Sequence, residues 1–361
     1  MTYENPKLIL AHSALREGSI MWKSPSNLAI VKYWGKHGQQ LPKNPSLSLT
    51  LDTSFTQTKL HYAPRKVAGQ DISLSLLFEG QPHEGFAQRV KQFFRKILPI
   101  FPFLKQLDLT VETQNSFPHS SGIASSASAM SALALCCCSM EDEFFGTLDE
   151  DEVFDRKASY VARLGSGSAC RSIYPYWALW GETGEVPGSS NLYAVPMAEA
   201  VHPVFHTLHD DILIIRSGTK QVSSSAGHSL MQNHPFAEVR YQQARKNLYE
   251  LINALRTGDL EAFGKVAEKE ALMLHSLMMS APSPYILMAP HTITAIERVW
   301  AFRKETGHPV FFSLDAGPNL HVLYPETIIH EVRPFVDTQL APLCEESIYL
   351  QDWAGEGPEQ L

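Results

Sequence analysis

The 361-residue sequence has few cysteines, and their arrangement excludes two kinds of structural support. There are five cysteines, and Cys136, Cys137 and Cys138 are consecutive. Neighbouring helical cysteines cannot be bridged without distorting the backbone, and zinc sites use C-x-x-C-like spacings that are missing here. The cysteines are therefore expected to be small buried residues, and neither a disulfide framework nor a structural zinc site is predicted.

The chain also lacks features that direct a protein to a membrane. No apolar run approaches the roughly 18 residues of a membrane span. The N-terminal segment MTYENPKLIL has neither the basic start nor the cleavage site of a signal peptide. We therefore expect a cytoplasmic protein with no membrane partner.

The sequence has fewer basic than acidic residues, which gives a net charge of −8. Such a balance argues against nucleic acid as the main partner. It leaves a small anionic substrate open, since the local field of a cleft can oppose the overall charge. The histidines show no H-E-x-x-H or similar spacing, so the sequence identifies no metal ligands; those considered are His119, His206, His209, His228 and His275.

The length and composition predict a globular protein of two domains. Hydrophobic residues make up 44% and charged residues 19% of a chain that is too long for one ordinary core. The Gly/Ser-rich segment 181–191 resembles a linker, which suggests a boundary near residues 190–200. We expect an N-terminal domain over 1–195 and a C-terminal domain over 196–361.

Hydrophobic periodicity predicts strands and helices in irregular alternation, which favours α+β layers over a doubly wound parallel sheet. Strands are expected at 46–62, 107–114, 177–181, 212–217 and 310–314. Helices are expected at 84–98, 125–140, 151–164, 235–257, 259–279 and 292–306.

Segment 116–131, SFPHSSGIASSASAMS, is the most unusual local feature. It carries seven serines and a glycine and continues into an apolar helix. A helix N-terminus has unpaired N–H groups and a positive dipole end, so this junction suits a phosphate. A polar loop before a capped core helix remains the alternative. The segment lacks both the Walker pattern GxxxxGK[ST] and the dinucleotide pattern GxGxxG.

Two further segments combine cations with small residues. In 24–38, Lys32 and Lys36 flank two aromatic residues and could face an anion; a solvated basic turn is the alternative. In 163–174, RLGSGSACRSIY, glycines and serines precede Arg171, whose planar guanidinium can bind phosphate or carboxylate.

Two loops in the second half of the chain also carry reactive groups. Segment 217–228 is a polar loop with several hydroxyls and Lys220. In 311–319, FFSLDAGPN, an apolar strand ends on Asp315 before a Gly-Pro turn. A carboxylate held at the end of a strand is well placed for proton transfer, although capping a turn is a common alternative role.

Taken in order, these motifs resemble those of diphosphomevalonate decarboxylases of the GHMP kinase superfamily, over nearly the whole chain. The matching segments are NLAIVKYWGK, LPKNPSLSLTLD, FPHSSGIASSAS, GSGSACRS, VSSS and SLDAGP. The resemblance implies the GHMP kinase fold, with an N-terminal domain like ribosomal protein S5 domain 2 and a ferredoxin-like C-terminal domain. It also implies ATP and Mg²⁺ as cofactors and a homodimeric assembly.

The resemblance assigns four catalytic residues. Asp315 would orient or deprotonate the 3-hydroxyl of mevalonate 5-diphosphate, and Lys32 would keep Asp315 ionised. Arg171 would bind the carboxylate and diphosphate region, with Asn27 orienting it. Substrate-binding positions implied in the same way are Tyr33, Lys36, Ser166, Gly167, Ser168 and Ser224. ATP-phosphate positions are Ser121, Gly122, Ile123, Ala124, Ser125 and Ser126.

The implied reaction is ATP-dependent decarboxylation of mevalonate 5-diphosphate to isopentenyl diphosphate. A related 3-kinase or phosphomevalonate decarboxylase is the alternative within the fold, and a non-catalytic binding module is the alternative outside enzymes. The chain departs from the family pattern twice. His119-Ser120-Ser121 replaces the common Thr-Ala-Ala, and Ser225 stands where some bacterial members carry an arginine.

Overall fold

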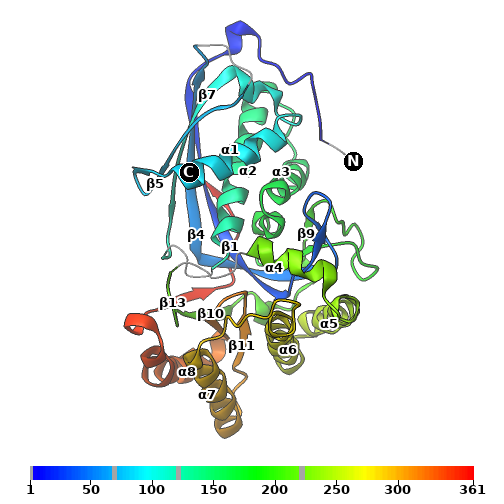
Figure 1. The fold of residues 1–361 in the computed structure, drawn as a ribbon, viewed down its shortest axis with the longest axis vertical. Coiled ribbons are helices and arrows are strands. Elements are labelled where there is room, and N and C mark those ends of the chain that lie inside the picture. The colour runs from blue at the N-terminus through cyan, green and yellow to red at the C-terminus, as the bar shows by residue number, and fades with distance from the viewer. Residues whose placement is uncertain (1–2, 67–70, 119–122, 219–223) are drawn as a thin grey trace.

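The computed structural model describes residues 3–66, 71–118, 123–218 and 224–361. Two β-sheets, each with its own helices, follow one another along the long axis of the molecule (Figure 1). The expected α+β class is confirmed. Within the described ranges, no helix has both the length and the apolar character needed to span a bilayer.

The first sheet has eight strands in the order β14-β1-β4-β7-β5-β6, with β8 joined to β4 and β9 to β8. All pairs are antiparallel except β5 with β7. Its strands are β1 (Gly18–Val31), β4 (Ser46–Pro64), β5 (Ser73–Phe78), β6 (Gln81–Pro82), β7 (Leu107–Asn115), β8 (Trp177–Trp180), β9 (Ala194–Pro196) and β14 (Glu359–Gln360). The expected strands at 46–62, 107–114 and 177–181 are therefore confirmed, and a small hairpin, β2 (Lys36–His37) and β3 (Leu41–Pro42), lies beside this sheet.

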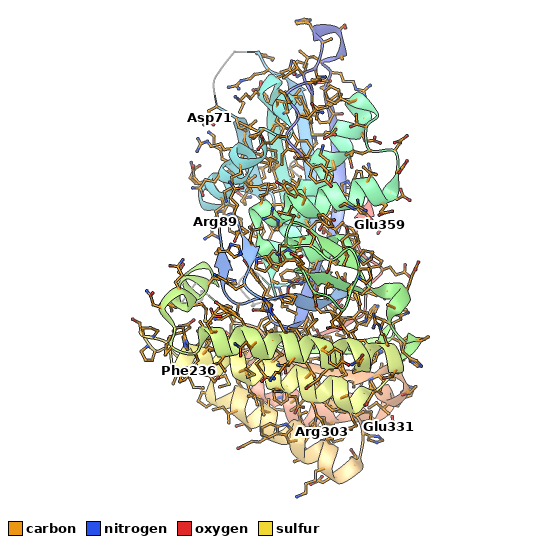
Figure 2. All side chains as sticks on the ribbon, turned by 90° about the vertical axis from the view of Figure 1, so that its right-hand side faces the viewer. Asp71, Arg89, Phe236, Arg303, Glu331 and Glu359 are labelled. Atoms are coloured by element: carbon orange, nitrogen blue, oxygen red, sulfur yellow. The ribbon has the colours of Figure 1, made fainter. Side chains whose placement is uncertain are left out.

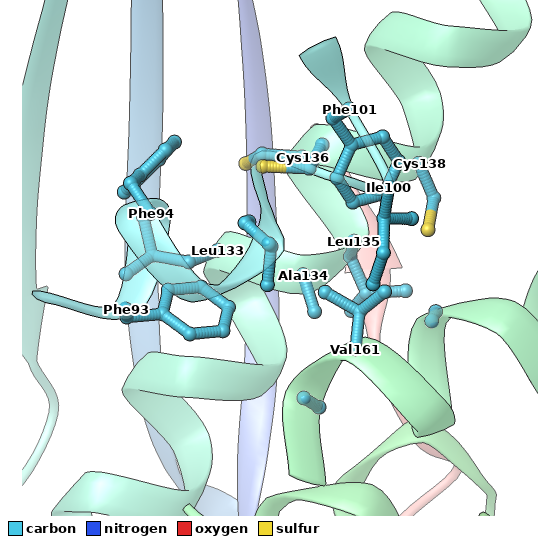
Figure 3. Packing of buried hydrophobic residues seen from close by; sticks show 14 of the residues in the cluster. Phe93, Phe94, Ile100, Phe101, Leu133, Ala134, Leu135, Cys136, Cys138 and Val161 are labelled. Carbon is cyan, nitrogen blue, oxygen red and sulfur yellow. The ribbon is translucent and has the colours of Figure 1, made fainter. Parts of the chain in front are cut away.

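Three helices pack with this sheet, namely α1 (Glu84–Ile97), α2 (Ser125–Phe145) and α3 (Asp151–Gly165). The central helix α2 is buried along most of its length between the strands and α3. Its cysteines are free and buried, as expected, and Figure 3 shows Cys136 and Cys138 near Phe101 and Leu135. Small sulfur side chains suit this position because α2 lies close to the strands.

The second sheet is antiparallel, with strand order β11-β12-β10-β13. Its strands are β10 (Leu208–Leu213), β11 (Phe311–Leu314), β12 (Leu320–Pro325) and β13 (Tyr349–Trp353). The helices of this half are α4 (Ser224–Leu230), α5 (Ala237–Thr257), α6 (Leu260–Met279), α7 (Pro290–Thr306) and α8 (Ile329–Phe335). The long helices predicted at 235–257, 259–279 and 292–306 are confirmed within two residues.

The strand predicted at 212–217 was wrong in position. The observed strand β10 begins four residues earlier and ends at Leu213. Its two central residues are Asp210 and Asp211, which resemble loop residues in sequence. Both carboxylates are fully buried, because His321 contacts Asp210 and the Tyr324 hydroxyl donates to Asp211. Partners on the neighbouring strand thus allow two acidic residues in a buried strand.

The linker-like segment 181–191 connects β8 and β9, which pair with each other in the first sheet. It is therefore a loop within that sheet. The chain also returns to the first sheet at its end, where β14 pairs with β1. The division into 1–195 and 196–361 stays a prediction.

Helix α5 runs across the molecule where the two halves meet, with Phe236 just before its first residue (Figure 2). Gly258 ends α5 in the left-handed conformation, and the Asp259 side chain then caps α6 by accepting the Ala262 N–H. A two-residue turn with this chemistry makes α5 and α6 adjacent. Their contact faces the end of β1.

A buried ion pair lies between these helices and β1. Arg240 on α5 donates two hydrogen bonds of 2.7 Å to Glu270 on α6, and both side chains are fully buried. Glu270 also accepts the backbone N–H of Lys32, and Arg240 donates to the Lys32 carbonyl. The pair therefore holds the segment that follows β1 against the second half of the chain.

We expect replacement of one member of the Arg240–Glu270 pair to lower the stability of the protein more than replacement of both. Arg240→Met leaves the Glu270 carboxylate buried without its counter-charge and should lower the free energy of unfolding by ~3–5 kcal/mol. Arg240→Met with Glu270→Gln leaves no lone charge and should recover most of that loss. Urea unfolding of both variants measures the difference; a double variant less stable than the single one would contradict the expectation.

Candidate active site

Lys32 and Asp315 form an ion pair between the two halves of the chain. Lys32 directly follows β1, and Asp315 directly follows β11. The Lys32 Nζ lies 2.8 Å from Asp315 Oδ1 and 3.0 Å from Ser313 Oγ. The lysine side chain is 2% exposed and the aspartate side chain 28% exposed. A buried cation thus holds a carboxylate that solvent and a ligand can still reach.

Irregular pairing between β1 and β4 precedes this lysine. The register shifts between Pro25 and Asn27 and again between Ala29 and Val31. Such bulges bend a strand and redirect its side chains, and they are frequent next to active sites. The first shift lies just before Asn27, and the second lies between Asn27 and Lys32.

Arg171 is fully buried and has only neutral partners. Its guanidinium donates to Ser48 Oγ at 2.9 Å, Ser46 Oγ at 2.7 Å and Asn27 Oδ1 at 3.1 Å. No carboxylate of the described residues lies within ion-pair distance of it. Burial lowers the pKa of this arginine, although the field of Asp315 acts in the opposite direction. A buried cation with neutral partners favours an anionic ligand.

Asn27 is fixed by three hydrogen bonds. Its Nδ2 donates to Ser172 Oγ at 2.8 Å and to the Ser168 carbonyl at 3.2 Å, while its Oδ1 accepts from Arg171. These partners leave one orientation for the amide, so Asn27 orients the guanidinium. The Ser168 carbonyl also ties this cluster to the short 3₁₀-helix Gly167–Ile173.

Tyr33 packs on the glycine of the same motif. A side chain at Gly167 would collide with the tyrosine ring, because a Cβ there would lie 2.7 Å from it. The Tyr33 hydroxyl is buried without a hydrogen-bond partner among the described residues, and burial raises its pKa. A buried hydroxyl without a partner is unusual and fits a ligand oxygen.

Lys36 lies on the hairpin beside this group. Its Nζ contacts Gln40 Oε1 at 2.9 Å, and partial burial together with nearby Lys96 lowers its pKa. Helix α4 reaches the same segment through His228, whose Nδ1 accepts the Gly35 N–H at 3.0 Å. Ser224 is the first residue of α4, and its side-chain contacts lie outside the described part of the structure.

The serine patch divides into two groups. Ser116, Ser128 and Ser131 bond to backbone or to neighbouring strands, as in the 2.6 Å contact of Ser128 Oγ with Thr56 Oγ1. Ser125 and Ser126 stand at the first turn of α2, and Ser126 Oγ lies 3.3 Å from Ser166 Oγ. Among the serines of this patch that the structure describes, those of the second group, with Ser166, are the candidates to face a ligand.

The loop before α2 is described only in part. Ile123 is buried, and its carbonyl accepts from Ser26 Oγ at 3.4 Å. Ala124 precedes the helix with a φ of 20°, a rare conformation outside glycine. The predicted positions Ser121 and Gly122, like His119, lie outside the described residues.

The donor set suits magnesium bound together with a nucleotide. Among the residues that the structure describes, no three carboxylate, imidazole or thiol groups gather as a metal site. Magnesium commonly uses one or two protein oxygens and completes its shell with phosphates and water. The hydroxyls of Ser125 and Ser126, at the positive end of α2, fit such a role.

Several residues of the site were missed by the sequence interpretation. Ser46, Ser48 and Ser313 lie in matching motifs but received no role of their own, Glu270 was only part of a predicted helix, and His275 was considered only among the histidines without metal-ligand spacing. Alternation in 46–50 offered one signal, since a strand whose serines are all buried needs polar partners inside. The sequence contained no such signal for Glu270 and His275, because their hydrogen-bond partners lie far away in the chain.

Two family models match the chain. The diphosphomevalonate decarboxylase-like N-terminal domain matches residues 24–194, and the mevalonate 5-diphosphate decarboxylase C-terminal domain matches residues 211–354. Among curated relatives, the diphosphomevalonate decarboxylase of Ganoderma lucidum is 28% identical over 86% of this chain and 79% of its own. That of Bos taurus is 27% identical over 85% and 77%.

Solved structures agree in fold. Mevalonate diphosphate decarboxylase from Staphylococcus aureus superposes with a TM-score of 0.80 at 26% identity, covering 96% of this chain and 98% of that chain. MDDEF in complex with MVAPP, AMPPCP and magnesium gives a TM-score of 0.78 at 27% identity, with coverage of 96% and 99%.

Two α+β halves with charged groups at their junction define the class, a two-domain enzyme acting on small anions. Within that class, the chain belongs to the diphosphomevalonate decarboxylase family.

His228 should make stability depend on pH. Burial, with Lys36 as a lesser cause, lowers the pKa of His228 from 6.5 to about 3, so the folded protein keeps the ring neutral. Between these values the unfolded chain binds a proton that the folded chain does not, and stability falls as pH falls. His228→Asn keeps an acceptor for the Gly35 N–H but removes this titration.

Urea unfolding between about pH 6 and pH 4 tests this expectation. The slope of stability against pH should be shallower in His228→Asn than in the wild type, by up to ~1.4 kcal/mol per pH unit. Equal slopes would show that His228 takes up its proton in the folded state.

Proposed function

We infer that the protein converts mevalonate 5-diphosphate and ATP to isopentenyl diphosphate, ADP, phosphate and CO₂. The observation that carries this inference is the joint presence of the Lys32–Asp315 pair and of Arg171, a buried cation with neutral partners. The activity named for the relatives is the same reaction. A non-catalytic binding module would not require a partly exposed carboxylate held by a buried lysine.

Asp315 is proposed to act on the 3-hydroxyl of the substrate. As that oxygen attacks the γ-phosphorus of ATP, its proton passes to the Asp315 carboxylate and the bond to ADP breaks. The Lys32 ammonium, 2.8 Å away, favours the ionised carboxylate before transfer and offsets charge that develops nearby. Phosphoryl transfer is governed mainly by positioning and charge neutralisation, which a buried ion pair supplies.

The second step removes phosphate and CO₂. The tertiary C–O bond breaks, phosphate leaves with the bonding electrons, and positive charge develops on the carbon. The bond to the carboxylate carbon then breaks, and its electron pair forms the double bond as CO₂ departs. Once Asp315 has passed the proton it accepted to the departing phosphate, its ionised carboxylate close to this carbon would stabilise the positive charge electrostatically.

Arg171 and Asn27 are proposed to bind the substrate's carboxylate and diphosphate region. The hydrogen bonds of Arg171 to Ser48, Ser46 and Asn27 use three of its five N–H donors, so two remain for an anion. Binding there is compatible with the net charge of −8, because the cations are gathered in one buried place.

The remaining predicted residues are proposed to hold phosphates. The Tyr33 hydroxyl, which has no hydrogen-bond partner among the described residues, supports a diphosphate contact at the glycine–serine motif. The set comprises Tyr33, Lys36, Ser166, Gly167, Ser168 and Ser224. ATP phosphates are proposed to lie at Ser121, Gly122, Ile123, Ala124, Ser125 and Ser126, where magnesium would neutralise phosphate charge when bound. A cytoplasmic homodimer with domains 1–195 and 196–361 completes the proposal.

One assay distinguishes the candidate activities. Purified protein is incubated with ATP, Mg²⁺ and mevalonate 5-diphosphate while ADP and CO₂ are measured together. We expect equal amounts of both products. ADP without CO₂ would indicate a 3-kinase, turnover of the monophosphate alone would indicate a phosphomevalonate decarboxylase, and no turnover would favour the binding module.

Replacing Asp315 tests its assignment. Asp315→Asn keeps the size of the side chain but removes the proton acceptor and the negative charge. We expect kcat to fall by at least ~10²–10⁴-fold, the usual value of a proton-transfer role, while substrate binding changes little. Calorimetric titration with mevalonate 5-diphosphate checks the second part. A variant with near wild-type kcat would remove Asp315 from the catalytic role.

A further inference from the structure

A single helix, α6, contacts the backbone of both members of the Lys32–Asp315 pair. Glu270 Oε2 accepts the Lys32 N–H at 2.9 Å, and His275 Nε2 lies 3.1 Å from the Asp315 carbonyl oxygen. The two contacting residues are separated by about 7.5 Å of helix at 1.5 Å per residue. Lys32 and Asp315 come from opposite halves of the chain, and α6 is in contact with both.

The Glu270 end of this arrangement is rigid. Its carboxylate is fully buried and accepts hydrogen bonds from Arg240 and from Asn247 Nδ2 on α5. The Lys32 carbonyl receives bonds from Arg240 and from Asn44 Nδ2 at 3.1 Å. Both the N–H and the carbonyl group of Lys32 are therefore held by hydrogen bonds. These bonds fix the position of the backbone from which the lysine side chain extends.

The contact of His275 with the Asp315 carbonyl is equally well defined. The residue is 1% exposed, and burial lowers its pKa to about 4, so the ring is neutral at ordinary pH. A carbonyl oxygen can only accept, so Nε2 carries the hydrogen and donates it to Asp315. The same carbonyl accepts the Gly317 N–H at 2.7 Å. His275 thus anchors the tight turn from which the Asp315 carboxylate projects.

We propose that Glu270 and His275 are positioning residues, which together set the separation between the Lys32 ammonium and the Asp315 carboxylate. Within the described part of the chain, neither side chain bonds to the Lys32 ammonium or the Asp315 carboxylate; each bonds instead to the backbone of one of these two residues. This proposal rests on the proposed function of Asp315 and Lys32. It explains why groups from two halves of the chain meet at hydrogen-bond distance, since one helix holds the backbone of both residues.

The test compares two variants of His275. His275→Gln places an amide donor near the position of Nε2, whereas His275→Leu fills the space without a donor. We expect kcat of His275→Leu to fall by about 10- to 100-fold, the scale of a misplacement of about 1 Å, while KM changes little. His275→Gln should recover most of kcat. Equal kcat in all three proteins would overturn the proposal.

His234→Leu is the matched control. His234 is also buried, and its Nε2 contacts the carbonyl of Leu277 on the same helix at 2.9 Å. Within the described residues, it makes no hydrogen bond to Lys32 or Asp315. Its replacement should lower the melting temperature about as much as His275→Leu but leave kcat unchanged. If His234→Leu lowers kcat equally, the effect is general destabilisation and the positioning role is rejected.

The positioning role of Glu270 is tested in two double variants that both lack the Arg240 charge. Arg240→Met with Glu270→Gln keeps an oxygen for the Lys32 N–H, whereas Arg240→Met with Glu270→Leu removes it. The Gln combination should have the higher kcat, at similar KM. Equal kcat in the two combinations would show that the Lys32 N–H contact does not position the lysine.

A crystal structure of His275→Leu provides a readout that does not depend on the reaction. We expect the Asp315 turn to shift and the Lys32 Nζ–Asp315 Oδ1 distance to exceed 2.8 Å. An unchanged distance would overturn the proposal even if activity fell. Absence of turnover in the wild type would instead contradict the proposed function and would leave this structural result to be judged separately.

Discussion

The carboxylate of Glu270 is the point on which the architecture of the site depends. It is fully buried, so its charge must be compensated, and Arg240 and Asn247 supply that compensation from α5. Once paired, it accepts the N–H of Lys32 and joins the end of β1 to the second half of the chain. The lysine then reaches Asp315 across the junction. Stability and geometry are therefore coupled, because the bonds that hold the halves together also position the ion pair.

Charge is distributed unevenly in this acidic protein. The chain carries a net charge of −8, yet the buried cations near the junction include Lys32 and Arg171. Lys32 has a carboxylate partner, whereas Arg171 is held by two serines and an asparagine. Neutral acceptors orient the guanidinium without cancelling its charge. An anionic ligand can therefore gain from this site, because the protein bears the cost of burying the cation when it folds.

Sequence periodicity predicted most helices and strands, since apolar spacing reports which face is buried. It failed at β10, where Asp210 and Asp211 are buried through partners on another strand. Motif resemblance identified Asn27, Lys32, Arg171 and Asp315, and the structure brings these residues together in two neighbouring clusters. Their assigned roles stay predictions. Resemblance gave no indication of His275, whose contact with Asp315 depends on how α6 lies beside the turn.

The sequence by itself determined the class of elements, the family and the types of reactive side chain, because these follow from local periodicity and from motifs of adjacent residues. Tertiary structure decided which of the described serines of segment 116–131 bond to the strands and which stand at the first turn of α2 beside Ser166. It also decided that Arg171 has only neutral partners and that one helix holds both Lys32 and Asp315. These properties are distances between residues far apart in the chain, and only the packing of the two halves sets such distances.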